Sequence, residues 1–211
     1  MAEVNVLVAF YSRDGSVETL AKSVAEGARS EGAQVRLRRA REIASPEVMA
    51  GVPNWAENAQ RMNALYEAPT AADAEWADAI LFGSPTRFGM ISSELKAYID
   101  TLGGLWFQGK LNGKPGGAFT STATPHGGQE TTLVSLYAPL AHLGLIIVPT
   151  GYADAAAFKA GSPYGATSVA GQTNIPPTAD DLEMARFQGR RTARIAKALK
   201  AGGLLPGSSP A

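Results

Sequence analysis

Two short, almost continuous apolar runs constrain the fold of this chain more than any other feature of its 211 residues. The runs cover residues 4–10, where Asn5 is the one polar residue, and 79–83, and neither shows a regular alternation of apolar and polar side chains. They are too short for typical helices, and strands buried on both faces of a sheet show this continuous pattern. We therefore predict two central strands in a sheet that other elements cover on both sides.

Helical periodicity follows the first run, after a short polar loop. Apolar side chains recur there at spacings of three and four residues, as on one face of an amphipathic helix. They are Val17, Leu20, Ala21, Val24, Ala25 and Ala28. The first 30 residues thus read as strand, loop and helix.

Further strands and helices alternate along the rest of the chain. Strand candidates lie at residues 35–38, 114–121 and 145–148. Helical segments lie at about 92–102, 128–143 and 178–200. Five strands that alternate with helices predict an α/β domain, with a parallel sheet covered on both faces by right-handed crossovers.

Three segments show no clear period. Residues 45–69 read as a long excursion with one short helix, and residues 105–107 as an apolar loop. Residues 150–177 are rich in Gly, Ser, Thr, Ala and Pro, and so long a connection is usually functional or part of an interface. Without a repeat or linker, we expect one domain over residues 1–201 and a flexible tail at 202–211.

Composition excludes several classes of function. The chain has no cysteine, which excludes disulfides, thiolate metal sites and thiol redox chemistry, so a redox role would need a bound cofactor. Its 19 basic and 19 acidic residues balance, which argues against nucleic-acid binding. No signal peptide or membrane-spanning run is evident, so we expect a cytoplasmic protein without membrane insertion. The histidines and acids do not show metal-ligand spacing.

The loop after the first strand is suited to bind a phosphate. It reads Ser12-Arg13-Asp14-Gly15-Ser16 and leads into the first helix, whose unpaired N–H groups and positive dipole end attract anions. It lacks the lysine of the P-loop and the paired glycines of the dinucleotide fingerprint. The alternative is an ordinary turn in which Ser16 is the helix N-cap.

Two more loops are expected at the same edge of the sheet. Residues 84–90 and 121–128 follow the third and fourth strands, and in open α/β sheets ligands bind beyond the carboxyl ends of the strands. The first of these loops combines a proline, a hydroxyl, a cation and an aromatic ring. The second offers hydroxyls and small residues that allow a ligand to approach closely. The three loops therefore predict one site.

At this point the chain resembles the flavodoxin-like NAD(P)H:quinone oxidoreductases named after the tryptophan-repressor-binding protein. The resemblance covers roughly residues 4–199. It rests on an ordered set of motifs, which are PTRFG at 85–89, GGLW at 103–106, GGQET at 127–131 and SPYGAT at 162–167. It implies a flavodoxin-like, doubly wound five-stranded parallel sheet with strand order 2-1-3-4-5 and helices on both faces.

The resemblance also implies FMN as cofactor, with NADH or NADPH as electron donor. By position, the residues matched to FMN-binding positions are Ser12, Arg13, Asp14, Gly15, Ser16, Val17, Thr86, Arg87, Phe88, Ser121, Thr122, Ala123, Thr124, Gly127 and His142. Trp106 matches an aromatic residue of the substrate pocket. Asp14 occupies the position that meets the nicotinamide, where relatives often have an aromatic or neutral residue. An extra residue at Pro125-His126 precedes the glycine pair.

The implied function is two-electron reduction of quinones by ping-pong hydride transfer through the flavin, in a homotetramer. No side chain acts as a nucleophile, because the flavin carries the chemistry. The alternative is a flavodoxin-type carrier that passes electrons to protein partners. Such carriers dock through acidic surfaces, and the neutral charge of this chain favours the enzyme.

Overall fold

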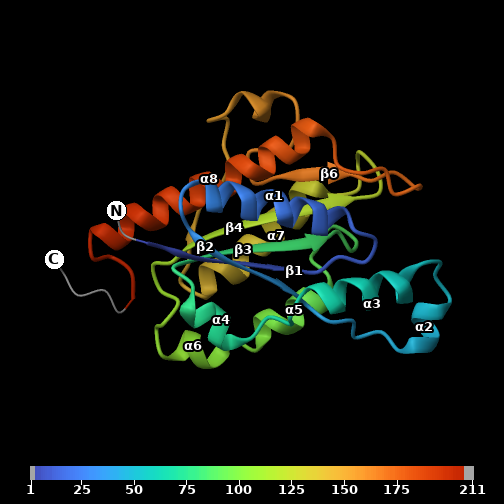
Figure 1. Ribbon diagram of the computed structural model, residues 1–211, viewed down its shortest axis with the longest axis horizontal. Coiled ribbons are helices and arrows are strands. Elements are labelled where there is room, and N and C mark those ends of the chain that lie inside the picture. Colours follow the sequence, from blue (N-terminus) through green and yellow to red (C-terminus); the bar gives the residue numbers. More distant parts are fainter. Residues whose placement is uncertain (1–2, 207–211) are drawn as a thin grey trace.

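The computed structural model describes residues 3–206, which form a parallel sheet between two layers of helices (Figure 1). Within these residues the sheet has six strands, and its main path runs β2-β1-β3-β4-β5. The strands are β1 (Asn5–Phe10), β2 (Gln34–Arg39), β3 (Ala79–Pro85), β4 (Pro115–Thr122), β5 (Ile146–Ile147) and β6 (Thr167–Val169). The predicted strand order 2-1-3-4-5 is confirmed.

The two apolar runs form the central strands β1 and β3, which pair directly with each other. Successive side chains of a strand point to opposite faces, so β1 contributes to two separate cores. Val6, Val8 and Phe10 join one core, whereas Leu7 and Ala9 join the other. Burial on both faces explains why neither run alternates with polar residues.

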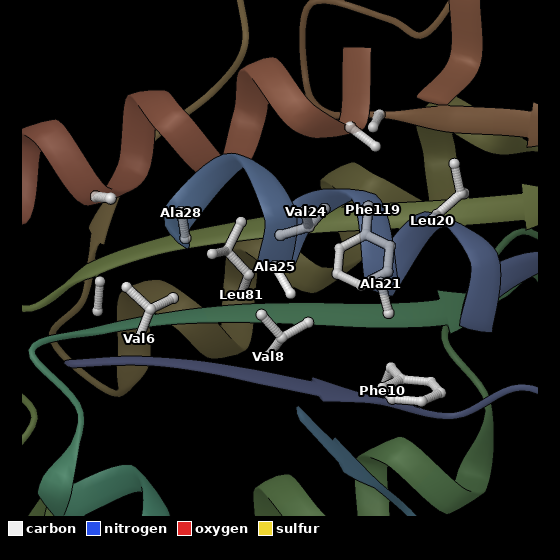
Figure 2. Packing of buried hydrophobic residues seen from close by; sticks show 14 of the residues in the cluster. Val6, Val8, Phe10, Leu20, Ala21, Val24, Ala25, Ala28, Leu81 and Phe119 are labelled. Atoms are coloured by element: carbon white, nitrogen blue, oxygen red, sulfur yellow. The ribbon is translucent and has the colours of Figure 1, made fainter. Parts of the chain in front are cut away.

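Helices α1 (Ser16–Ser30) and α8 (Ala179–Ala201) cover the first face of the sheet. Figure 2 shows Val24, Ala25 and Ala28 of α1 above the side chains of the central strands. The two helices approach so closely that a Cβ at Gly27 would lie 1.9 Å from the carbonyl oxygen of Arg186 in α8. In the same way, a Cβ at Gly189 of α8 would lie 2.0 Å from the carbonyl oxygen of Val24.

The second face is covered by α4 (Ala71–Trp76), α5 (Ser93–Asp100) and α7 (Gln129–His142). Their apolar side chains form the second core with those of β1 and β3. Between α5 and β4 the chain forms α6 (Gly103–Phe107), so the prediction of an apolar loop there was wrong. Leu105 is the buried residue of this short helix, and its packing outweighs the low helix propensity of the two glycines.

The excursion after β2 contains two helices, α2 (Pro46–Ala50) and α3 (Trp55–Leu65), where one was predicted. Glu18, in the first turn of α1, ties α3 to the domain. Its buried carboxylate accepts hydrogen bonds from Arg61 of α3 at 2.6 and 3.2 Å and from the Tyr66 hydroxyl at 2.9 Å. Lys22 Nζ lies 2.9 Å away. Burial raises the pKa of Glu18, but these partners outweigh it and lower the pKa to about 2.

The edge position beside β4 is shared by two short strands. β5 pairs with the beginning of β4, and β6 pairs with its end, from Thr120 to Thr122. The intervening segment contains the 3-10 helix η1 (Ala155–Phe158). The predicted strand at 145–148 is therefore shorter than expected, and a strand lies inside a segment in which none was predicted.

Strand β2 lies at the other edge and has the alternating pattern expected of an edge strand. Arg36 and Arg38 share one face, where both contact Asp73 Oδ1, at 3.1 and 3.2 Å. The Arg36 guanidinium also lies 3.9 Å from the ring centroid of Trp76. The long stems of these arginines cover the sheet while their charged groups are paired.

The single domain over residues 1–201 and the flexible tail stay predictions. Leu205 is buried, whereas residues 207–211 of that tail lie outside the described residues. Among residues 3–206, no helix is both long and apolar enough to cross a membrane. The same residues contain no group of three or more histidine or acidic side chains arranged to hold a metal ion.

Candidate functional site

The loop predicted to bind a phosphate, residues 12–16 and called the phosphate loop below, turns from β1 into the N-terminus of α1. Gly15 is the N-cap, with a φ of 101° that glycine adopts readily and other residues do not. No side chain caps the helix, and Ser12 Oγ instead accepts a hydrogen bond from the N–H of Gly15 at 3.1 Å. Ser16 is therefore the first residue of the helix and not its N-cap. The first-turn N–H groups are left without a side-chain acceptor, which is the arrangement that binds anions.

A cavity of about 620 Å³ opens in front of this loop. It lies at the carboxyl ends of β1, β3 and β4, where the topology predicted a site. Its lining includes ten of the predicted residues, which are Ser12, Arg13, Asp14, Ser16, Val17, Thr86, Arg87, Ser121, Thr122 and Ala123.

Thr86 holds two of the converging loops together. Its hydroxyl donates to the carbonyl oxygen of Gly127 at 3.3 Å and accepts from the Thr132 hydroxyl at 2.8 Å. It also accepts from the N–H of Gly89 at 3.2 Å, which closes the turn that follows β3. One threonine side chain therefore fixes the spacing of the loops on either side of the cavity.

Four predicted residues belong to these loops without lining the cavity. They are Gly15, Phe88, Thr124 and Gly127. Phe88 has a φ of 55°, and its side chain is fully exposed. This exposed aromatic ring, on a strained turn next to the lining residue Arg87, is available to contact a ligand or another molecule.

Trp106 and His142 lie elsewhere in the chain. Trp106 is in α6, before β4 begins, and His142 ends α7, before β5 begins. In a parallel sheet the beginnings of the strands form the edge opposite to the cavity, and Figure 1 shows α6 at that end of the sheet. Both side chains are exposed, Trp106 by 53%. The chain by itself does not bring them to the cavity.

Two further segments line the cavity, and the sequence reasoning missed both. Val52, Pro53 and Asn54 precede α3, and residues 170–174 follow β6. Each segment contains an asparagine with positive φ, 62° at Asn54 and 55° at Asn174. A Pro-Asn pair and a Gly-x-x-Asn stretch are turn signals, but nothing in the sequence indicates that these turns meet the phosphate loop.

The charges in the cavity are partly paired. Arg13 Nε donates to Asp14 Oδ2 at 3.0 Å, and the Arg13 guanidinium lies 5.5 Å from the ring centroid of Trp55. The pair offsets the carboxylate that would otherwise repel a phosphate. Arg87 donates to the carbonyl oxygen of Thr86 at 3.0 Å and, within residues 3–206, has no acidic partner within salt-bridge distance. The cavity therefore retains a positive charge beside a helix N-terminus.

Comparison with known proteins agrees with this geometry. Residues 2–159 match the family described as NADPH-dependent FMN reductase. The chain belongs to this family. It is 48% identical to an NAD(P)H dehydrogenase (quinone) of Cupriavidus metallidurans over 92% of this chain and 98% of the relative. It is 44% identical to the protein of the same name from Deinococcus radiodurans, over 92% and 96%.

Solved structures of flavodoxin-like proteins have the same fold as this chain. A flavodoxin, WrbA-like protein from Agrobacterium tumefaciens has a TM-score of 0.65 at 27% identity, over 92% of this chain and 98% of that one. Oxidised flavodoxin 1 from Bacillus cereus has a TM-score of 0.59 at 17% identity, over 90% and 97%, a likeness of fold alone. Family membership confirms the resemblance inferred from the motifs, and with it an oxidoreductase that uses FMN.

Proposed function

We propose that this protein is an FMN-dependent NAD(P)H:quinone oxidoreductase. The observation that carries the proposal is the uncapped N-terminus of α1, which opens onto a cavity bounded by the loops after β3 and β4. The relatives named NAD(P)H dehydrogenase (quinone), over nearly their full length, support the choice of substrates. Either NADH or NADPH would serve as the donor.

The residues present fit FMN. In our proposal its phosphate is held by the hydroxyls of Ser12 and Ser16 and by backbone N–H groups between Arg13 and Val17. No lysine is needed, because a bound phosphate that is not transferred requires only hydrogen bonds and the helix dipole. When bound, FMN supplies two-electron hydride chemistry that no side chain of this chain provides.

The ring of the cofactor would lie between the two loops that Thr86 joins. Thr86, Arg87 and Phe88 would contact it from one loop, and the other loop would contribute Ser121, Thr122, Ala123, Thr124 and Gly127. The positive charge of Arg87 would stabilise negative charge on the ring, and the Thr86 hydrogen bonds would hold the loops at a fixed spacing. Asp14, on the phosphate loop, would meet the nicotinamide.

A single cavity for both substrates implies ping-pong kinetics. The nicotinamide would leave before the quinone enters, and double-reciprocal plots at several quinone concentrations would be parallel. Intersecting lines would contradict this order. We place the activity in the cytoplasm, where NAD(P)H is available, and cell fractionation would test that location.

We also propose a homotetramer, in which a neighbouring copy brings Trp106 and His142 to the cavity. Both residues match site positions of the family, yet both lie exposed at the opposite edge of the sheet. Analytical ultracentrifugation should give the mass of four chains. A monomer with full quinone reductase activity would contradict the proposal.

The decisive experiment is to add FMN to the purified protein and to measure its fluorescence. Binding should quench the flavin, and the loaded protein should then reduce benzoquinone with NADH or NADPH. Absence of quenching would overturn the whole assignment. Flavin binding without benzoquinone turnover would instead support the alternative, a flavodoxin-type carrier that passes electrons to protein partners.

A further inference from the structure

Arg39 is a fully buried arginine that contacts the phosphate loop from β2, the strand beside β1. It is the last residue of β2 and lies opposite Phe10 in the parallel pairing of β1 and β2. Its position is therefore next to the point at which β1 leaves the sheet for the loop. Arg39 Nη2 donates a hydrogen bond of 2.9 Å to the carbonyl oxygen of Ser12.

The rest of the guanidinium is held by side chains that follow β2. Glu42 forms an ion pair with both terminal nitrogens, and Nη1 also donates to Asn63 Oδ1 at 2.7 Å. The ring centroid of Tyr11 lies 5.4 Å from the guanidinium carbon. Arg39 Nε, in contrast, is buried without a hydrogen-bond partner. The guanidinium thus donates to the Ser12 carbonyl through Nη2, although its Nε–H is left without an acceptor.

The contact with Ser12 fixes the direction of a donor in the loop. A trans peptide is planar, and its N–H points opposite to its C=O. Because the Ser12 carbonyl is directed at Arg39, the N–H of Arg13 points away from Arg39. Ser12 and Arg13 both line the cavity. We propose that Arg39 is a positioning residue for phosphate binding, which acts through the Ser12 carbonyl. This inference rests on the proposed FMN site.

A buried ion pair could also serve the fold alone. Burying two charges costs several kcal/mol each before their attraction is counted, and apolar replacement of such pairs is often neutral or stabilising. A role in stability alone would affect all ligands of the cavity alike. A role in orienting the phosphate donors would affect FMN but not riboflavin, which is FMN without its phosphate.

The test compares these two flavins on the full-length chain after removal of flavin. The double variant Arg39→Met/Glu42→Leu removes the contact with Ser12 without leaving a buried charge unpaired. We expect it to bind FMN about tenfold more weakly, as for the loss of one charge-assisted hydrogen bond. Riboflavin affinity, measured by the same fluorescence titration, should change by less than about threefold.

Arg41→Met is the matched control. Arg41 is a neighbouring arginine that donates to Asn63 Oδ1 at 2.5 Å and to the carbonyl oxygen of Tyr66 at 2.8 Å, and it makes no hydrogen bond to the phosphate loop. Its loss should leave FMN affinity within about threefold. Equal weakening in Arg41→Met would assign the effect to a general disturbance of the segment around Asn63, which both arginines contact, and would overturn the proposal.

Other outcomes are equally decisive. Unchanged FMN affinity in the double variant, or an equal loss of FMN and riboflavin, would overturn the role of Arg39. If circular dichroism shows the double variant to be unfolded, Arg39→Lys replaces it, because a single ammonium group cannot bond Glu42, Asn63 and Ser12 with the fork of a guanidinium. It too must weaken FMN selectively. Wild-type protein that fails to quench FMN would refute the proposed function itself.

Discussion

Replacing Gly189 by alanine should destabilise the protein, although alanine is the better helix former. Gly189 lies in the interior of α8, where the exchange alone would stabilise the helix by about 1 kcal/mol. The structure opposes this gain. The new Cβ would lie 2.0 Å from the carbonyl oxygen of Val24, 2.9 Å from its carbonyl carbon and 3.0 Å from the nitrogen of Ala28.

These contacts are with the backbone of α1, so no side-chain rotation relieves them. The helices must separate by roughly 1 Å or more to restore van der Waals contact. That movement loosens the packing of Val24, Ala28 and Ala185 in the first core. Overpacking typically costs about 1–3 kcal/mol, and a clash with fixed backbone atoms belongs at the upper end, about 3 kcal/mol. After the gain in helix propensity, we expect a net loss of about 2 kcal/mol, or a melting temperature lower by roughly 4–8 °C.

The assay is thermal and urea unfolding followed by circular dichroism. The urea midpoint should fall while its slope stays the same, because the surface exposed on unfolding is unchanged. Gly104→Ala in α6 is the matched control, since a Cβ there would meet no atom within 4 Å. It should be neutral or stabilising. An unchanged or higher midpoint in Gly189→Ala would refute the packing argument.

Four further predictions concern charges and the phosphate loop. The pKa of Glu18 is lowered to about 2 in the folded protein, so the free energy of unfolding of the wild type should fall by up to about 3 kcal/mol between about pH 5 and pH 2. Urea titrations of Glu18→Gln should not show this loss. Burial lowers the pKa of Lys114 to about 8, so between about pH 8 and 10.5 the unfolded chain binds more protons than the folded protein. Over this range the free energy of unfolding, measured by urea titration, should rise by up to about 3 kcal/mol relative to that of Lys114→Met. Gly15→Ala forces alanine to a φ of 101° and should weaken FMN binding about tenfold in a fluorescence titration, whereas unaltered affinity would speak against this loop as the phosphate site. Asp14→Ala should change the Michaelis constant for NAD(P)H more than the affinity for FMN, and the reverse ranking would place Asp14 at the phosphate.

The parallel sheet could be predicted because its central strands are buried on both faces. Such strands leave a continuous apolar run, and the topology then dictates which loops meet. Strand β6 could not be predicted in this way. It consists of Thr167, Ser168 and Val169, and it is a strand because β4 offers an unpaired edge beyond the point at which β5 ends. That cause lies in the tertiary structure and not in the local sequence.

The candidate site could be predicted in part for the same reason. Ligands bind at the carboxyl ends of parallel strands, and this rule brings the three loops together from the order of the predicted strands alone. The segments at 52–54 and 170–174 lie more than ten residues beyond the predicted strands at 35–38 and 145–148, so the rule, which concerns the loops directly at the strand ends, did not include them. Trp106 and His142 entered through the family resemblance alone, and their placement in the site stays a prediction that depends on a second copy of the chain.

The row of arginines on β2 limits how copies of this protein can associate. An exposed edge strand has unpaired backbone groups that can template a strand from another molecule. Arg36 and Arg38 are fixed on this strand by Asp73, so a second chain that added itself there would meet two bulky cations already engaged with their own domain. Growth of the sheet from one molecule to the next, which is the route to fibrous aggregates, is thereby discouraged. An assembly that avoids this edge can instead form through helices and loops, which present the exposed side chains of Phe88, Trp106 and Phe107.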